Sequence, residues 1–258
     1  MNTPKEKKYY MPAEWYPHKC CWMQWPYNNP NHDGYGAIPS WSHFDFEKGR
    51  LAWANVANSI VEFEKVKMMT HPDEISTAKN LLDSRIEIIK LKLDDCWARD
   101  SGAIFLLNNE NKLGGVDWEF NGWGKFKPYD SDNKIAKFMI KNSSATYFKN
   151  NMILEGGSIH VDGEGTLITT EQCLLNKNRN PKLSKKEIEK NLKEYLNISK
   201  IIWLKSGTDE GTDGHVDNVA CFVKPGTVMA LTCKDKSDPF YEKINENLEI
   251  LKCSTDSK

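Results

Sequence analysis

The 258-residue sequence predicts an α/β protein that folds as one domain built from repeated supersecondary units. Strand-like segments alternate with segments whose apolar residues recur at helical spacing, and no long linker interrupts them. Three polar clusters recur at similar distances, because Asp100 precedes Glu155 by 55 residues and Glu155 precedes His215 by 60. A period in this range is typical of a propeller or solenoid of supersecondary units and argues against a Rossmann sheet.

Strands are predicted wherever β-branched and aliphatic residues run together or alternate with polar ones. The segments with this pattern are residues 20–26, 65–71, 86–95, 102–109, 113–120, 200–205, 216–223 and 227–232. Residues 152–175 are predicted to form two more strands, joined at Gly163–Gly165.

Helices are predicted at residues 46–64, 72–83, 131–141 and about 238–251, and one more follows Ser184. Ser184 and Glu187 have the spacing of a capping box, in which each side chain bonds the backbone of the other. Apolar residues then recur on one face of that helix, which predicts packing against a core.

Composition excludes several classes of protein. The formal net charge is −1, from 35 basic and 36 acidic residues, so neither a nucleic-acid surface nor a basic membrane patch is expected. Apolar runs fall far short of the roughly 20 residues of a membrane span, and the first residues lack the apolar core of a signal peptide. The seven cysteines are irregularly spaced and form no C-x-x-C pair, which favours reduced thiols in the cytoplasm.

The polar clusters are "DDCWARDSG" (94–102), "LEGGSIHVDG" (154–163) and "TDGHVDN" (212–218). Each contains or ends at glycine, where backbone can approach a ligand closely. His215 and Asp217 are two residues apart, so on the predicted strand their side chains point to the same face. Taken singly, each cluster is also compatible with a surface ion pair, a turn or a structural histidine.

Together the clusters supply Asp100, Glu155, Asp217 and the imidazole of His215. A metal hydrolase that also uses His160 is a minor alternative, because zinc sites usually take two histidines at helical spacing. The glycine-rich stretches match neither a dinucleotide fingerprint nor a P-loop, so no nucleotide cofactor is expected.

Four motifs in this order carry a family resemblance: "MPAEW" from residue 11, "WARDSG" from 97, "EGGSIHVDGEGT" from 155 and "GHVDN" from 214. The chain resembles the agmatine deiminase family of the guanidine-modifying (pentein) superfamily over nearly its whole length. The resemblance implies a five-bladed α/β propeller of ββαβ-type modules, with the active site at its centre. Residues 1–258 would form a single domain of this kind, incomplete at its C-terminal end.

The resemblance also implies roles for five residues. Asp100 and Asp217 would grip the planar guanidinium of a small cationic substrate, agmatine, with forked charge-assisted hydrogen bonds. His215 would be the general acid/base, Glu155 would orient it, and Trp97 would line the pocket beside the substrate, although a core position suits this tryptophan equally well. The reaction would convert agmatine and water to N-carbamoylputrescine and ammonia, with no cofactor, and a homo-oligomer is compatible with it.

The family's nucleophilic cysteine lies in a late glycine-rich block that this sequence does not contain. Cys253 follows a predicted helix without a glycine turn or histidine, and Cys96 is a weak candidate in the predicted strand before Trp97. The cysteines at 20, 21, 173, 221 and 233 are predicted to lie in apolar core strands. The last module is therefore expected to be missing, so that an open strand edge promotes association.

Two other functions remain open at this stage. A peptidylarginine-type deiminase would share the guanidinium site but recognise a different tail. A catalytically dead guanidine-binding protein would keep Asp100 and Asp217 without turnover.

Overall fold

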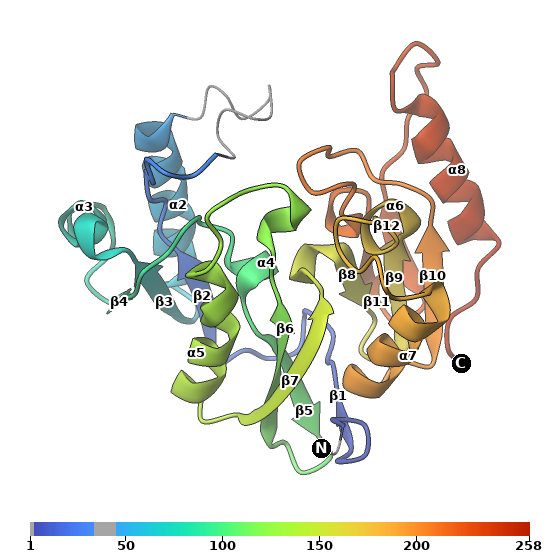
Figure 1. Cartoon of the computed structure of the whole chain (residues 1–258), viewed down its shortest axis with the longest axis horizontal. Helices are drawn as coiled ribbons and strands as arrows, with labels where there is room; N and C mark the ends of the chain where they lie inside the picture. Colours follow the sequence, from blue (N-terminus) through green and yellow to red (C-terminus); the bar gives the residue numbers. More distant parts are fainter. Residues whose placement is uncertain (1–2, 34–44) are drawn as a thin grey trace.

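Four β-sheets and their covering helices follow one another through the protein, in a computed structural model that describes residues 3–33 and 45–258. Figure 1 shows the β2–β4 region at one side, the sheet with β5–β7 in the middle, and β8–β12 at the other side. None of the helices in the described part of the chain has the length and apolar character needed to cross a bilayer.

The first sheet contains three parallel strands: β2 (Cys20–Gln24), β3 (Lys65–Thr70) and β4 (Glu87–Lys90). Their connections are helical: α2 (Phe46–Ile60), then the 3₁₀ turn η1 (Pro72–Glu74) continuing into α3 (Ile75–Leu81). Asp45 caps α2 by accepting two backbone N–H bonds, as expected for an aspartate at a helix start. Trp25 and Met68 lie fully buried in the core between these helices and the sheet.

The second sheet has the order β1–β5–β6–β7. Its strands are β1 (Tyr9–Tyr10), β5 (Ile104–Asn108), β6 (Leu113–Glu119) and β7 (Thr146–Ile153). β5 and β6 form an antiparallel hairpin, and β7 returns parallel to β6 after η3 (Asp132–Lys134) and α5 (Ile135–Asn142).

The third sheet repeats this connectivity. β8 (Ile159–Val161) and β9 (Thr166–Thr170) form an antiparallel hairpin, and β10 (Lys200–Leu204) returns parallel to β9. The crossover contains α6 (Glu171–Leu174) and α7 (Lys185–Tyr195). The capping box predicted for Ser184 and Glu187 is confirmed, and Ile188 and Leu192 are buried as expected.

The fourth sheet is a hairpin of β11 (Ala220–Lys224) and β12 (Thr227–Ala230), followed by α8 (Tyr241–Lys252). A hairpin followed by helix thus occurs three times in succession, and in the second and third sheets a parallel strand completes it. This recurrence is the structural counterpart of the periodic spacing in the sequence.

Most predicted elements are confirmed, but β1 was not expected and four further stretches differ. Residues 216–218 form a 3₁₀ turn, η5 (Val216–Asn218), so His215 and Asp217 do not lie on the extended strand that the sequence predicts. The strand predicted for 86–95 ends at Lys90, and residues 171–174 form a helix because Thr170 caps it. β7 begins at Thr146, six residues before any strand was expected.

Candidate functional site

Three short turns bring the polar clusters together, and each turn follows a parallel strand of a different sheet. Asp100 lies in α4 (Ala98–Ser101), after β4. Glu155 precedes the 3₁₀ turn η4 (Gly156–Ser158), after β7. His215 precedes η5, after β10. Because the carboxyl ends of parallel strands are where α/β folds place their ligand-binding loops, these turns form a candidate active site.

Gly157 lies where the clusters converge. A Cβ atom on this glycine would lie 2.5 Å from His215 Nδ1, 2.6 Å from Asp217 Oδ2 and 2.8 Å from Asp100 Oδ1. Three ionisable side chains, one from α4 and two from the segment around η5, therefore approach the backbone of Gly157. The position requires glycine because any side chain would occupy the space that these groups share.

His215 is buried between two carboxylates. Its Nδ1 lies 3.8 Å from Asp100 Oδ1, and its Nε2 lies 3.9 Å from Glu155 Oε2. Among the described residues, neither His215 Nε2 nor Glu155 Oε2 has a partner at hydrogen-bonding distance, although both atoms are buried. Unsatisfied buried polar atoms are costly, so a polar ligand or a small approach of the two side chains would stabilise this arrangement.

Glu155 is held from its other side by Arg179, whose side chain is fully buried. Arg179 Nε donates to Glu155 Oε1 at 2.6 Å, Nη1 donates to Asp213 Oδ2 at 2.7 Å, and Nη2 donates to the Thr212 carbonyl at 2.9 Å. One guanidinium therefore joins the Glu155 turn to the loop that leads into His215. It neutralises Glu155 and leaves Oε2 directed toward the imidazole.

Asp100 is fixed by two donors. The Gly157 N–H donates to Oδ1 at 2.8 Å, and the indole Nε1 of Trp123 donates to Oδ2 at 3.0 Å. Trp123 occupies the left-handed region at φ 55° between two glycines that are also left-handed. Such a conformation is rare for a bulky residue, and its occurrence here indicates a position shaped by the site.

Asp217 is the most accessible acid of the cluster, with 29% of its side chain exposed. Burial raises its pKa, and the nearby Asp100 carboxylate adds to the increase, whereas His215 and Arg99 oppose it. Arg99 Nε lies 3.4 Å from Asp217 Oδ2, so a guanidinium of the protein itself already faces this carboxylate.

Glu14 connects a fourth segment to the site. It pairs with Arg99 Nη1 at 2.5 Å and with His160 Nε2 at 3.2 Å. The hydrogen bond from His160, assisted by the Arg99 guanidinium, lowers the pKa of Glu14 to about 2. His160 Nδ1 accepts a bond from the Phe222 N–H, which accounts for both ring nitrogens of this histidine.

The ligand atoms that lie together at the site differ from those of the metal alternative. Within the described residues, the close group of metal-binding atoms at the site is Glu155, Cys173 and His215, and it does not include His160. Cys173 is buried on α6, and burial together with the Glu155 carboxylate raises its pKa well above the ordinary thiol value. This thiol is not set up as a nucleophile.

The other cysteines differ in part from the prediction. Cys96 is buried but lies in a bend and not in a strand, and Cys233 lies in a loop, partly exposed. Cys20, Cys21 and Cys221 are in strands but only partly buried.

Trp97 precedes α4 and is 39% exposed, so it is not a core tryptophan. Its ring packs edge-on against Trp53, with centroids 5.4 Å apart. Both rings line an apolar pocket of about 260 Å³ that also includes Trp22 and Ala98. Asp100, Asp217 and His215 are not among the residues that line this pocket, so the role of Trp97 beside the substrate stays a prediction.

Sequence reasoning overlooked the residues that hold the cluster in place: Gly157, Trp123, Arg179 and Glu14. The "NGWG" stretch offered a signal, because a residue between two glycines commonly adopts an unusual backbone conformation. Arg179 offered none, since a single arginine in a loop is ordinarily exposed.

The sequence is similar to those of known deiminases. Residues 10–258 match the family of Porphyromonas-type peptidyl-arginine deiminases. The agmatine deiminase of Pseudomonas aeruginosa (strain LESB58) is 41% identical over 265 residues, which span all of this chain and 69% of the relative. The agmatine deiminase of Medicago truncatula is 40% identical, with 99% of this chain and 70% of the relative covered.

Solved structures of agmatine deiminases are also similar to this chain. The agmatine deiminase of Enterococcus faecalis superposes with a TM-score of 0.89 at 37% identity, covering all of this chain and 70% of that one. A C. jejuni agmatine deiminase with substrate bound gives a TM-score of 0.81 at 30% identity, covering 95% and 71%. The chain thus spans about seven tenths of the length of the relatives it matches.

Proposed function

Because the chain belongs to the family of Porphyromonas-type peptidyl-arginine deiminases and agmatine deiminases, we propose that it takes part in the hydrolytic deimination of a small guanidine, agmatine. The observation that carries this proposal is the convergence of Asp100, Asp217 and His215 around Gly157. Two carboxylates on one side of a planar cation match its N–H groups, and guanidinium–carboxylate bonds of this kind are among the strongest neutral-pH hydrogen bonds in proteins. Arg99 beside Asp217 supports the same chemistry.

His215 and Glu155 would handle the protons. A cysteine thiolate attacks the guanidinium carbon, one C–N bond breaks, and His215 gives a proton to the departing ammonia. Water deprotonated by the same imidazole then attacks the carbon of the thiouronium, which restores the thiolate and releases the ureido product. Glu155 would stabilise the protonated imidazole, since its Oε2 faces Nε2 across 3.9 Å. The nucleophile is expected in the family's glycine-rich block, in the part of the relatives outside the matched region.

The recurrent hairpin, helix and parallel strand support a propeller of ββαβ modules around this site. Residues 1–258 would then belong to a single domain, with the free edge of β12 taking the next parallel strand. The two completed repeats place a parallel strand at the matching position, on the second strand of their hairpin. The irregular spacing of the cysteines, without a C-x-x-C pair, suits a cytoplasmic setting.

Agmatine-dependent thermal stabilisation tests the binding step directly. A ligand at 100 times its Kd should stabilise the native protein by about 2.7 kcal/mol. Asp100→Asn should lower agmatine affinity by about 10- to 150-fold, because a hydrogen bond to a charged group contributes roughly 1.5–3 kcal/mol. The exposed Asp130→Asn serves as the matched control. Equal stabilisation of wild type and Asp100→Asn would remove Asp100 from the substrate site.

A guanidine-binding protein without turnover is the second candidate, because the one thiol beside His215 and Glu155 among the described residues is the buried Cys173. Ammonia release separates the two candidates, since the binder shows stabilisation by agmatine and produces none. The family name makes peptidyl-arginine a further substrate to test. Competition between agmatine and a peptidyl-arginine identifies the preferred tail.

A further inference from the structure

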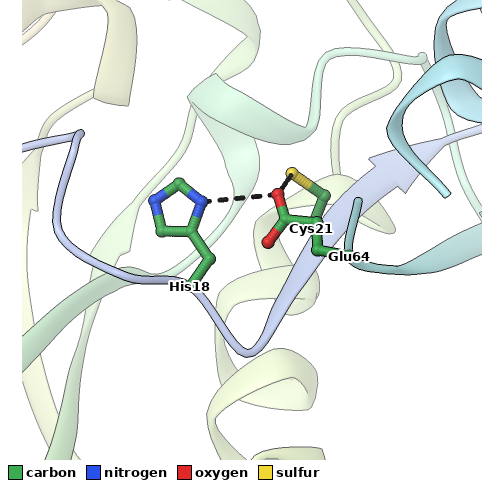
Figure 2. Close-up of side chains that lie close together, drawn as sticks. All are labelled: His18, Cys21 and Glu64. Atoms are coloured by element: carbon green, nitrogen blue, oxygen red, sulfur yellow. Dashed lines mark hydrogen bonds and ion pairs between the residues drawn. The ribbon is translucent and has the colours of Figure 1, made fainter. Parts of the chain in front are cut away.

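A second group of chemically active side chains lies at β2, an edge strand of the first sheet, and shares no residue with the cluster around Gly157. Figure 2 shows His18, Cys21 and Glu64 with their polar atoms directed toward one another. His18 Nδ1 lies 3.4 Å from Glu64 Oε1, and Cys21 Sγ lies 3.1 Å from the same oxygen. The nitrogen, sulfur and oxygen atoms all lie within 4.8 Å of one another.

The hydrogen bonds of His18 fix which nitrogen carries its proton. Nε2 lies 2.9 Å from the Glu14 carbonyl oxygen, which can only accept, so Nε2 carries hydrogen and donates. In the neutral imidazole, Nδ1 therefore presents a lone pair toward Glu64 Oε1, which already accepts from the Cys21 thiol. Two acceptors then face each other at 3.4 Å, and either a proton on Nδ1, which gives an ion pair with Glu64, or a metal cation between the two atoms would turn this repulsion into attraction.

The hydrogen bond from His18 Nε2 to the Glu14 carbonyl is of the kind that metal-bound histidines make. A ligating imidazole usually donates its other N–H to a carboxylate or a backbone carbonyl, which sets the tautomer and the ring orientation. The Glu14 carbonyl provides that partner here. His18 is therefore oriented with Nδ1 facing Glu64 and Cys21, as a ligand would be.

Two of the three separations between the ligand atoms suit a tetrahedral ion. With Zn–N and Zn–O of about 2.0 Å and Zn–S of about 2.3 Å, ligand atoms around zinc are about 3.3–3.5 Å apart. The observed 3.4 Å for the nitrogen–oxygen pair agrees with this spacing, and the 3.1 Å sulfur–oxygen pair needs to open by only a few tenths of an ångström. We propose that His18, Cys21 and Glu64 form a zinc site with one open coordination position.

The placement of the three ligands supports this site. Cys21 is on β2, and Glu64 is held in the turn after α2 by its N–H bond to the Ile60 carbonyl. His18 comes from the segment that leads into β2, and 49% of its side chain is exposed, so an ion and its fourth ligand, water, can reach the group. Histidine nitrogen, cysteine sulfur and a carboxylate together favour zinc over the oxygen-seeking magnesium and calcium.

Cobalt(II) is the first probe, since it occupies zinc sites and reports a bound thiolate by a charge-transfer band in the near ultraviolet. The full-length protein should bind one equivalent of Co²⁺ with this band, and Zn²⁺ should displace it. Cys21→Ser should abolish the band, and His18→Ala and Glu64→Gln should each weaken Zn²⁺ affinity by more than the about 10- to 100-fold that loss of an outer-shell partner costs. Because His18 and Glu64 lie near the surface, these two variants are expected to fold.

Cys20→Ser is the matched control. Cys20 is the neighbouring residue on the same strand, so its side chain points to the opposite face. The Cys20→Ser substitution should therefore leave the band unchanged. Two results would overturn the site: no thiolate band in the wild-type protein, or an equal band in Cys21→Ser. Zn²⁺-dependent thermal stabilisation provides an independent readout, and it should be present in the wild-type and Cys20→Ser proteins and absent from the ligand variants.

Discussion

At the scale of single residues, Gly157 decides whether the site can form. Gly157→Ala would place a carbon less than 3 Å from atoms of His215, Asp217 and Asp100, so all three must move. A displacement of about 1 Å in a catalytic group can lower a rate about 100-fold, so in a protein that includes the nucleophile we expect a deimination rate at least that much lower. The melting temperature and ammonia release should be measured together. Gly49→Ala, inside α2, is the control, and an active Gly157→Ala would place the reacting centre elsewhere.

Asp217 gives a prediction about pH. Burial and Asp100 raise its pKa in the folded state, so the ionised form is less favourable there than in the unfolded chain. The resulting loss of stability begins as pH rises through the ordinary aspartate pKa of about 3.9 and is complete above the raised value. Asp217→Asn should therefore raise the melting temperature of ligand-free protein at neutral pH, with no gain near pH 3. Its agmatine affinity should nevertheless fall by about 10- to 150-fold. A gain in stability that is the same at both pH values would contradict the cause assigned to this pKa.

At the scale of elements, Arg179 holds two loops through one buried side chain. Arg179→Met would leave Glu155 and Asp213 without their shared cation, and breaking a buried pair in this way costs about 3–5 kcal/mol. Urea unfolding measures the loss. Arg85→Met is the matched control, because its ion pairs with Glu62 and Asp83 lie at the surface, where solvent screening leaves them little effect on stability. Comparable losses of unfolding free energy in the two variants would show that burial of the Arg179 pair adds nothing to the stability of the protein.

Elements with a regular apolar pattern were predictable from the sequence, and those with buried polar residues were not. β7 was missed because Asn150 occupies its buried face, where it accepts from the Met152 N–H and donates to Asn191. The apolar alternation that identifies a strand is interrupted there, and only tertiary hydrogen bonds make the asparagine acceptable.

The candidate site shows the same division. Asp100, Glu155 and His215 could be selected from the sequence because they recur at similar distances beside glycines, and Asp217 because of its H-x-D spacing, while the family resemblance supplied their roles. Strand alternation was expected to bring His215 and Asp217 together. In the structure the 3₁₀ turn η5 does so instead. Local spacing identified the groups, whereas the turns and the long-range bonds of Arg179 and Trp123 determine how they meet.

At the scale of the whole molecule, the repeated hairpin, helix and parallel strand explain why polar clusters that recur along the sequence meet at one site. Each of the first three sheets ends in chain order with a parallel strand, and the residue that enters the site follows that strand. The hairpin β11–β12 starts the same pattern again, and α8 follows it. In the two complete repeats, the edge that corresponds to the open side of β12 is occupied by a parallel strand.

The open edge of β12 predicts how the polypeptide of residues 1–258 behaves when it is produced alone. Unpaired strand edges with apolar side chains promote pairing between chains, and Val223, Met229 and Leu231 are 50%, 63% and 43% exposed at this hairpin. We therefore expect concentration-dependent association in light scattering coupled to size-exclusion chromatography. Met229→Lys should reduce it, because a charge on an edge strand disfavours pairing, whereas Phe63→Lys, at a residue 92% exposed beyond α2, should not. A cleanly monomeric 1–258 polypeptide that unfolds cooperatively would mean that this edge is already protected and that no further strand is needed beside β12.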